Sequence, residues 1–381
     1  MVTNEEKQRV WQAYHSRKPV RVPVLFGVNP RAVLFNPEWN PGGISFEEYA
    51  SDASALIEIQ LQLMEYQTQV INRYCDSPVG RPEEWAFYVD NQNFYDAAYF
   101  GSPVEFRDGQ VGDAVPILAG SDRNRIFKMD IEHPLDNPFI KQCLRRYEDI
   151  KTALSSLSYH GMSFRVNPPT MGFDGHLTIA TCLRGAELYS DIYEDPEYVR
   201  CLLDFIHRGV VIRNRALAEL FSQKAFSGSS GGFADDSIQL ISTNTYRELI
   251  LPFHRAWYAL WSVEGPHSIH LCGDATRHFL TIHEELNVYS FDTGFPVDHG
   301  SLRKTLGNDV EILGGPEVSV LLNGTSKQVY ERTRDILKSG VMEGGRFILR
   351  EANNLPPNCP EENLAAMYRC CLEHGNYDQQ V

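Results

Sequence analysis

The chain has 381 residues, of which 43% are hydrophobic and 22% charged, a composition typical of a folded globular protein. At this length it can form one large α/β barrel or two ordinary domains. The formal net charge is -15 and no block of lysine or arginine stands out, which argues against a nucleic-acid partner. No stretch approaches 18 apolar residues, so we expect no membrane-spanning helix.

The N-terminus and the cysteines predict a cytoplasmic protein. The first seven residues lack the basic start and the apolar run of a secretory signal. The eight cysteines are scattered through a large chain, which suits reduced thiols better than a disulfide framework. The oligomeric state stays open, with a homodimer as one option.

In chain order, the first predicted element is an amphipathic helix over 5–17, with Asn4 as its N-cap. The apolar run 21–27 predicts a buried strand, and Asn29 and Arg31 follow it in a loop. If this is the first strand of a barrel, both residues lie at the rim where substrate binds. An ordinary polar loop is the alternative.

A capping box at residues 45–48 predicts a long helix to about residue 69. Residues 72–122 are rich in aromatic and turn residues and do not follow a strand–helix rhythm. We interpret them as a cap or insertion that contains a hairpin near 104–109. Further on, the sequence predicts a helix over 140–157, a strand over 161–166, and helices over 178–188 and 195–222.

Two loops in this part carry candidate site residues. The loop 167–176 is dense in proline and glycine and ends at His176; irregular loops of this kind often carry function. The glycine-rich segment 227–233 fits neither a Walker loop nor a dinucleotide fingerprint. Asp235 and Asp236 follow it, and two carboxylates at a strand end can hold a metal, a cationic group or a proton. The alternative is a solvated turn with a helix cap.

The second half alternates strands and helices. After a helix over 243–261, strands are predicted at 268–272, 288–292, 310–315 and 345–351, with helices at 276–286, 302–306, 325–339 and 362–371. This rhythm predicts an α/β fold, specifically a (β/α)8 TIM barrel with an N-terminal helical and aromatic cap, formed by residues 1–381 as a single domain.

The segment from Ser268 to Asp274 is the centre of the predicted site. Side chains alternate along a strand, so His270 and Cys272 point the same way. Imidazole and thiolate are ligands that zinc favours, and Asp292 ends the next strand. With 12 histidines and 8 cysteines, one such pair is unsurprising by chance. A buried thiol beside a hydrogen-bonded histidine is the alternative.

Several segments together resemble the uroporphyrinogen decarboxylase superfamily, and the resemblance covers nearly the whole chain. The superfamily includes the decarboxylase, the corrinoid-protein methyltransferases and, more distantly, the barrel of cobalamin-independent methionine synthase. The resemblance implies a (β/α)8 barrel with its site at the C-terminal ends of the strands. The matching segments are Pro19–Val24, Leu183–Glu187, Tyr193–Glu197, Asp235-Asp236, Tyr246–Pro252, His270–Gly273, Leu313–Pro316 and the tail from Pro356 to Asn363.

Within the superfamily the sequence is more similar to the methyltransferases. The decarboxylase carries an Arg-Gln-Ala-Gly-Arg motif after its first strand, where this chain has Gly27-Val28-Asn29-Pro30-Arg31. The resemblance implies that His270 and Cys272 bind zinc, and that a methyl group passes between a small molecule and a cobalamin on a separate corrinoid protein. The family's third ligand is a cysteine at the position of Asn353.

Our first hypothesis is therefore a zinc-dependent methyltransferase. Its metal ligands would be His270, Cys272 and Glu351, with Asp292 or Cys359 as other candidates for the third position. Asp235, Asp236 and Asp292 would be catalytic, and Asn29, Arg31, His176 and Asn353 would contact the small-molecule substrate.

Two other hypotheses stay open. One is a metal-free lyase of the decarboxylase type, in which the three aspartates stabilise cationic intermediates and arginines such as Arg31, Arg184 and Arg350 bind substrate carboxylates. The other is a non-catalytic binding protein on the same fold, because a fold does not fix a function.

Overall fold

The structure is a computed structural model that describes residues 2–228, 231–261 and 266–377. The chain groups into two compact units. Unit 1 comprises Met1–Gly43, Ile59–Pro82 and Ser268–Val381, and unit 2 comprises Ile44–Glu58 and Glu83–His267. Helix α4 (Ala53–Gln69) belongs to both ranges. Within the described ranges, no helix is long and apolar enough to cross a membrane.

Unit 1 is built on a sheet in which β6, β7, β8 and β9 are neighbours in that order. The pairs β7–β8 and β8–β9 are parallel, with Asp292 opposite Leu313 and Ile312 opposite Phe347. These strands are short and rich in β-branched and aromatic residues, which suits a buried parallel sheet. Their bounds are β6 His267–Leu271, β7 Val288–Thr293, β8 Glu311–Gly314 and β9 Phe347–Leu349.

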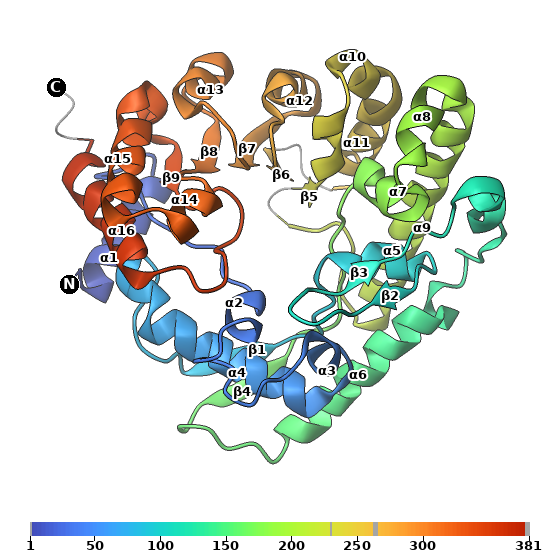
Figure 1. Cartoon of the computed structure of the whole chain (residues 1–381), viewed down its shortest axis with the longest axis horizontal. Helices are drawn as coiled ribbons and strands as arrows, with labels where there is room; N and C mark the ends of the chain where they lie inside the picture. Colours follow the sequence, from blue (N-terminus) through green and yellow to red (C-terminus); the bar gives the residue numbers. More distant parts are fainter. Residues whose placement is uncertain (1, 229–230, 262–265, 378–381) are drawn as a thin grey trace. The chain divides into compact units, whose positions relative to one another are not determined.

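Helices connect the strands of unit 1, as parallel pairing requires. Figure 1 shows α12 and α13 next to the sheet strands, and α15 and α16 side by side. The α-helices with bounds in unit 1 are α1 Asn4–His15, α2 Arg31–Leu34, α12 Phe279–Leu286, α13 His299–Leu306, α14 Val318–Asn323, α15 Ser326–Ile336 and α16 Glu361–His374. The cap of α1 is Thr3, not the predicted Asn4, because Thr3 and Glu6 form a reciprocal capping box.

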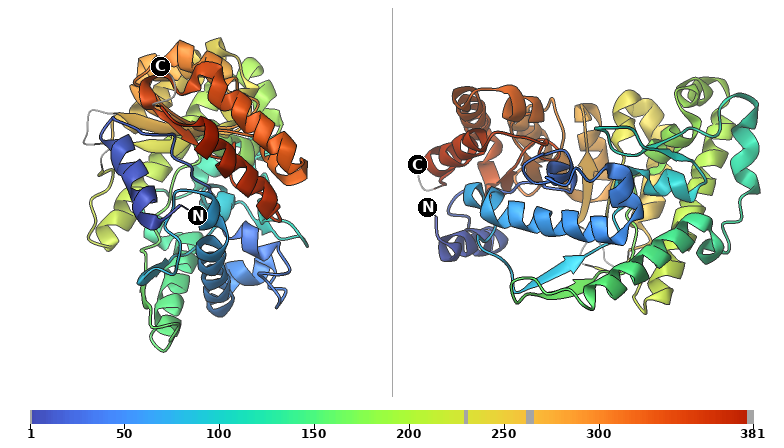
Figure 2. Two further views of the ribbon diagram at one scale, coloured as in Figure 1. Left: turned by 90° about the vertical axis from the view of Figure 1, so that its left-hand side faces the viewer. Right: turned by 60° about the horizontal axis from the view of Figure 1, so that its bottom comes forward.

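Unit 2 contains a parallel strand pair and a hairpin. Strand β1 (Glu84–Phe87) pairs with β4 (Ser163–Val166), and β2 (Val104–Glu105) pairs antiparallel with β3 (Asp113–Ala114). Figure 2 (right) shows the β1–β4 pair beside α6. The other elements are α3 Phe46–Ser51, α5 Tyr95–Tyr99, α6 Pro138–Leu154, α7 His176–Arg184, α8 Glu187–Glu194, α9 Pro196–Leu220, β5 Gly232–Ala234, α10 Thr243–Thr245 and α11 Leu251–Tyr258. Asp195 caps α9 with Pro196 in its first turn, so this helix begins where the sequence predicted it.

Two predicted helices are interrupted. The helix predicted from 45 to 69 divides at Asp52, which is extended (φ -107°, ψ 130°) and whose carboxylate accepts a hydrogen bond from Ala55 N. Aspartate favours such a cap over a helix interior because its side chain competes for backbone N–H groups. The helix predicted over 178–188 ends at Arg184, since Gly185 takes φ 70°.

The strand predicted over 21–27 forms isolated bridges instead of a continuous ladder. Val24 bridges to Leu349 in parallel, but Pro23 has no N–H to donate. The N–H of Val24 binds the Asp76 carboxylate at 2.7 Å, and the N–H of Gly27 binds Glu351 Oε1 at 2.9 Å. These two backbone N–H groups therefore donate to side-chain carboxylates and not to the backbone of a neighbouring strand. The sequence also missed β1, which lies inside the segment predicted as a cap.

The fold class is α/β, with parallel pairing and strand–helix alternation as predicted. The described strand pairs do not close into one ring, so the closure of an eight-stranded barrel stays a prediction, as does the cap over 72–122.

A buried histidine in unit 1 makes stability sensitive to acid. His299 is 4% exposed, and neither ring nitrogen has a hydrogen-bond partner among the described residues. Burial, with a contribution from Arg332, lowers the pKa of His299 from 6.5 to about 4. Between these values the unfolded chain binds a proton that the folded chain does not, so stability falls as pH drops through this window, by about 3 kcal/mol in total.

We expect His299→Leu to unfold at a lower pH than the wild type in an acid titration followed by circular dichroism. The matched control is His15→Leu, which replaces an exposed histidine of α1 and should leave the acid midpoint unchanged. Identical acid midpoints for His299→Leu and the wild type would contradict the assignment.

Candidate metal and active sites

His270 and Cys272 meet at the end of β6. Ile269 and Leu271 are buried in the core, so the alternation of the strand turns His270 to the other face. His270 Nε2 lies 3.0 Å from Cys272 Sγ. The predicted pairing of these side chains is therefore present, and the His270 side chain is 27% exposed.

Asp292 holds the other side of the His270 ring. Its Oδ2 lies 2.8 Å from His270 Nδ1 and accepts a second hydrogen bond of 2.8 Å from Arg350 Nη1. Burial disfavours the protonated ring, but the hydrogen bonds to Asp292 and Cys272 outweigh it and raise the pKa of His270 to about 10. Without a metal, the ring is a cation between two acidic partners.

Arg350 links the ends of β7 and β9. Besides Asp292, its guanidinium binds Glu351 Oε1 at 2.8 Å and the backbone carbonyl of Asn353. Glu351 is fully buried, and burial raises its pKa to about 7 although Arg350 opposes this. Glu351 Oε2 has no partner among the described residues, so it keeps free lone pairs for a ligand.

Two glycines let the backbone of this region pack closely. A Cβ on Gly294 would collide with the main chain of Cys272 and Gly273, so only glycine lets the loop after β7 approach the loop after β6. A Cβ on Gly27 would collide with Arg350 and Glu351. The position of Cys272 is therefore set by main-chain contact.

The predicted substrate residues of unit 1 lie in loops and a short helix. Asn29 Oδ1 accepts a hydrogen bond of 3.0 Å from Arg31 N at the start of α2. Asn353 follows β9 and takes φ 130°, a conformation that L-residues rarely adopt. The alternative third ligand Cys359 is buried, which raises its pKa to about 12, and its thiol hydrogen-bonds Leu321 O at 3.4 Å.

Asp235 in unit 2 is engaged by the N-terminus of α7. Its Oδ1 accepts hydrogen bonds of 2.9 Å from Thr178 N and Thr178 Oγ1, and its Oδ2 accepts one of 3.1 Å from Leu177 N. His254 Nε2 lies 2.9 Å from the same Oδ2. The residue is fully buried. Asp235 thus binds the N-terminus of a helix, as a cap does, but it is buried and not in the solvated turn of the alternative that the sequence left open.

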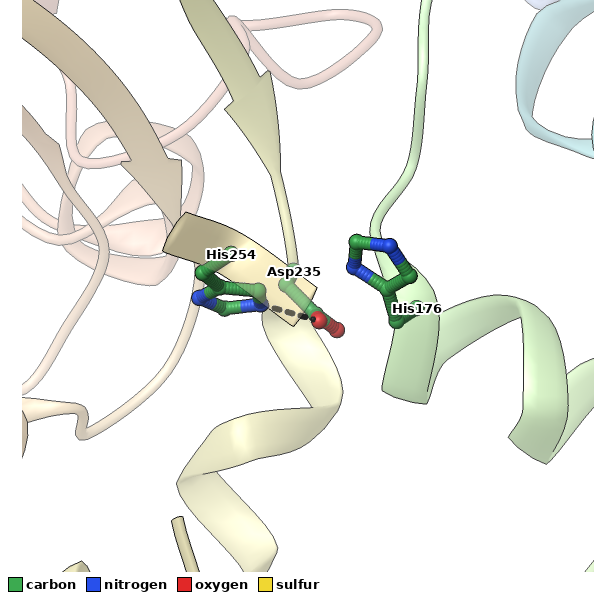
Figure 3. A group of neighbouring side chains, drawn as sticks. All are labelled: His176, Asp235 and His254. Carbon is green, nitrogen blue, oxygen red and sulfur yellow. Dashed lines mark hydrogen bonds and ion pairs between the residues drawn. The ribbon is translucent and has the colours of Figure 1, made fainter. Parts of the chain in front are cut away.

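His176 and His254 lie on either side of Asp235, as Figure 3 shows. His176 Nε2 lies 3.0 Å from His207 Nδ1, and burial lowers the pKa of His176 well below 6.5, which keeps the ring neutral. The sequence placed His176 at the end of a functional loop but missed His254. His176, Asp235 and His254 are far apart along the chain, so no sequence spacing connects them. Only a comparison of all polar residues near helix starts and strand ends could have grouped them.

Asp236 and Asp174 form a second acidic group in unit 2. Asp236 is half-buried and begins a short 3-10 helix after β5. Burial raises the pKa of Asp174 to about 8, with Asp96 and Asp236 adding to the shift. Tyr95 donates a hydrogen bond of 2.9 Å to Asp174 Oδ1. Asp174 was not singled out from the sequence, although it lies in the loop predicted to be functional.

The arginines required by a lyase are mostly committed to partners. Arg184 is buried and paired with Asp191 at 2.7 Å, and Arg350 is paired with Asp292 and Glu351. Two of the three arginines proposed to bind substrate carboxylates thus already form ion pairs with carboxylates of this chain.

Comparisons with known proteins identify relatives of this chain. The model of the uroporphyrinogen decarboxylase (URO-D) family matches residues 168–374. A methylated-thiol–coenzyme M methyltransferase of Methanosarcina mazei is 34% identical over 181 residues, which is 47% of this chain and 46% of that protein. A methylcobamide:CoM methyltransferase of Methanosarcina acetivorans is 26% identical over 208 residues, which is 52% of this chain and 56% of that protein.

A solved structure is similar over nearly the whole length. It is a methyltransferase from Methanosarcina mazei, with a TM-score of 0.63 and 14% identity, covering 98% of this chain and 99% of that one. At this identity the likeness shows a shared fold. The matches to the two curated relatives span about half the length of each.

Proposed function

Because the chain belongs to the uroporphyrinogen decarboxylase family, we propose that it is a methyltransferase that moves a methyl group between a small molecule and a corrinoid protein. The names of the two curated relatives, which act on methylated thiols, methylcobamide and coenzyme M, support this reaction class. The proposal includes a (β/α)8 barrel over 1–381 with 72–122 as its cap, in a cytoplasmic enzyme for which a homodimer is one option.

The observation that carries the proposal is the array Asp292–His270–Cys272. A metal-ligating histidine usually donates its second ring N–H to a carboxylate, which fixes the tautomer and the ring orientation. Asp292 stands in that position on Nδ1, and Nε2 faces a thiol at 3.0 Å. An imidazole and a thiolate are donors that zinc favours. The residues present therefore fit a zinc ion held by His270 and Cys272.

We propose Asp292 as a positioning residue for His270, because its Oδ2 lies 2.8 Å from the ring nitrogen that would not bind the ion; its Oδ1 has no partner in the described ranges. Glu351 stays our candidate for the third ligand, because its Oε2 is buried and has no partner in the described ranges, but its oxygens do not lie within 4.8 Å of both His270 and Cys272, so binding requires its side chain to move. Arg350 holds both carboxylates in place. The sequence suggested Asp235 and Asp236 as catalytic residues. Because the oxygens of Asp235 accept hydrogen bonds from α7, we now propose Asp236 for the catalytic role.

When the methyl group moves from the corrinoid to a thiol, the reaction requires a nucleophilic sulfur on the small molecule. A bond from sulfur to the methyl carbon forms as the bond between that carbon and its carrier breaks, so the sulfur must lose its proton. When bound, zinc would act as a Lewis acid that lowers the pKa of a coordinated thiol. Asn29, Arg31 and Asn353 of unit 1 remain our proposed substrate contacts, whereas His176 of unit 2 is 0% exposed and is no longer proposed as one.

We expect Cys272→Ala to lose about one zinc ion per chain relative to the wild type, together with methyl transfer from methylcobalamin to coenzyme M. Elemental analysis of the purified protein and the loss of methylcobalamin absorbance measure the two effects. Cys201→Ala, which replaces an exposed free cysteine, is the matched control and should change neither. Equal zinc content in wild type and Cys272→Ala would reject the site.

Two further variants test the third ligand in the same assay. Glu351→Gln removes the carboxylate, and we expect it to release zinc at a lower chelator concentration than the wild type. Asn353→Cys supplies the cysteine that the family has at this position, and we expect it to retain zinc at a higher concentration. If Glu351→Gln retains zinc as the wild type does, another residue completes the site.

A further inference from the structure

A second group of ligand-type atoms lies in unit 2, away in sequence from His270 and Cys272. One nitrogen of His176, one nitrogen of His254 and one oxygen of Asp235 all lie within 4.8 Å of one another. They come from the start of α7, from α11 and from the residue after β5 (Figure 3). All three residues are 0% exposed.

The His176 ring is oriented as a metal ligand would be. Its Nε2 lies 3.0 Å from His207 Nδ1, which can accept the ring N–H. That tautomer leaves a lone pair on Nδ1. In the described part of the chain Nδ1 is buried and has no hydrogen-bond partner. An unpaired buried nitrogen costs about 1–3 kcal/mol, so the position calls for an explanation.

His254 can adopt the same arrangement once its proton moves to the other ring nitrogen. Its Nδ1 lies 3.1 Å from Tyr246 Oη, and its Nε2 lies 2.9 Å from Asp235 Oδ2. When the proton sits on Nδ1 and is donated to the tyrosine oxygen, Nε2 is free to bind an ion. Both histidines thus have a partner on one nitrogen and turn the other toward Asp235.

Asp235 is fixed in place by three donors from α7, on Leu177 N, Thr178 N and Thr178 Oγ1. Of the two carboxylate oxygens, Oδ2 is the one that contacts His254. From α7 it accepts one hydrogen bond, donated by Leu177 N. Hydrogen bonds to the outer side of histidine and carboxylate ligands are the usual surroundings of a protein metal site.

We propose that His176, Asp235 and His254 bind a divalent transition-metal ion. Two imidazoles and one carboxylate favour zinc or a similar ion over calcium or magnesium, which prefer all-oxygen sites. On binding, the hydrogen bond between His254 and Asp235 is replaced by a bond from each residue to the ion, and the proton of His254 moves to Nδ1. The ion joins the start of α7, the end of β5 and α11, so its effect is to stabilise unit 2.

The test uses a background that lacks the other site. Full-length Cys272→Ala is treated with a chelator, dialysed, loaded with zinc and freed of excess ion, and its zinc is counted. We expect about one ion per chain, and none when His176→Leu is added. No zinc above background in folded Cys272→Ala overturns the proposal and leaves the methyltransferase hypothesis untouched.

Three further tests guard against misfolding. His254→Gln keeps a donor for Asp235 but removes the ligand nitrogen, so it should fold and bind no ion. Cobalt(II) in the Cys272→Ala background should give visible d–d bands without the thiolate charge-transfer band that Cys272 would supply. Zinc should also raise the thermal midpoint of Cys272→Ala and leave that of the His176→Leu double variant unchanged. A rise of equal size in both proteins would overturn the site.

Discussion

Arg213→Met is expected to lower the free energy of unfolding by about 3–5 kcal/mol, because it leaves a buried carboxylate without its cation. Arg213 is 0% exposed and binds Asp96 Oδ1 at 2.6 Å. Its guanidinium also donates to Gly172 O at 3.2 Å and lies 5.0 Å from the centre of the Tyr99 ring. Burial already raises the pKa of Asp96, and the charge of Arg213 opposes this.

Urea unfolding followed by circular dichroism measures the change. The control lies on the same helix: Arg208→Met removes an exposed pair with Glu132, whose side chains are 52% and 63% exposed, and should cost at most about 1 kcal/mol. Adding Asp96→Asn to Arg213→Met should recover part of the loss, since the uncompensated charge is then removed. Equal unfolding midpoints for Arg213→Met and Arg208→Met would refute the assignment.

The second large effect is on catalysis. Under the proposed function, we expect His270→Ala to lower kcat/KM for methyl transfer by about 1,000-fold, since losing the proposed metal ligand removes several kcal/mol of stabilisation at the reacting sulfur. Asp292→Asn keeps the shape of its partner but weakens the orientation of His270, so we expect a smaller loss of about 10- to 100-fold.

Steady-state rates with methylcobalamin and coenzyme M, together with zinc content, separate the two roles. His270→Ala should lose activity and about one zinc ion per chain, whereas Asp292→Asn should retain zinc at saturating metal and show a lower kcat. If Asp292→Asn loses as much zinc as His270→Ala at saturating metal, the carboxylate is a ligand and its assignment as a positioning residue is wrong. His283→Ala, a half-buried histidine of α12, serves as the control for histidine removal.

The main elements of the fold follow from local patterns. Period-two alternation placed His270 and Cys272 on one side of β6, and strand–helix alternation predicted the parallel pairing of β7, β8 and β9. Breaks inside helices were missed because Asp52 and Gly185 act through caps and backbone conformation, and neither changes the hydrophobic period.

The connections between site residues were harder to foresee. Glu351 was predicted as a ligand and Arg350 only as a carboxylate binder, yet one guanidinium joins Asp292, Glu351 and the Asn353 carbonyl. His254 joined the Asp235 group from a helix in which nothing marks it as a ligand. Such contacts form between residues that are far apart along the chain. A single sequence contains no fixed residue spacing from which they can be predicted.

The close approach of Gly294 to the main chain of Cys272 and Gly273 has an evolutionary consequence. Since main-chain contact sets the place of the thiol, the side chains around it are free to diverge without displacing it. Under the proposed function, residues that recognise one methylated compound can therefore be exchanged for others while the histidine–cysteine pair keeps its position. We expect position 294 to tolerate far fewer replacements in a mutational scan than positions 29, 31 and 353, which we propose as substrate contacts.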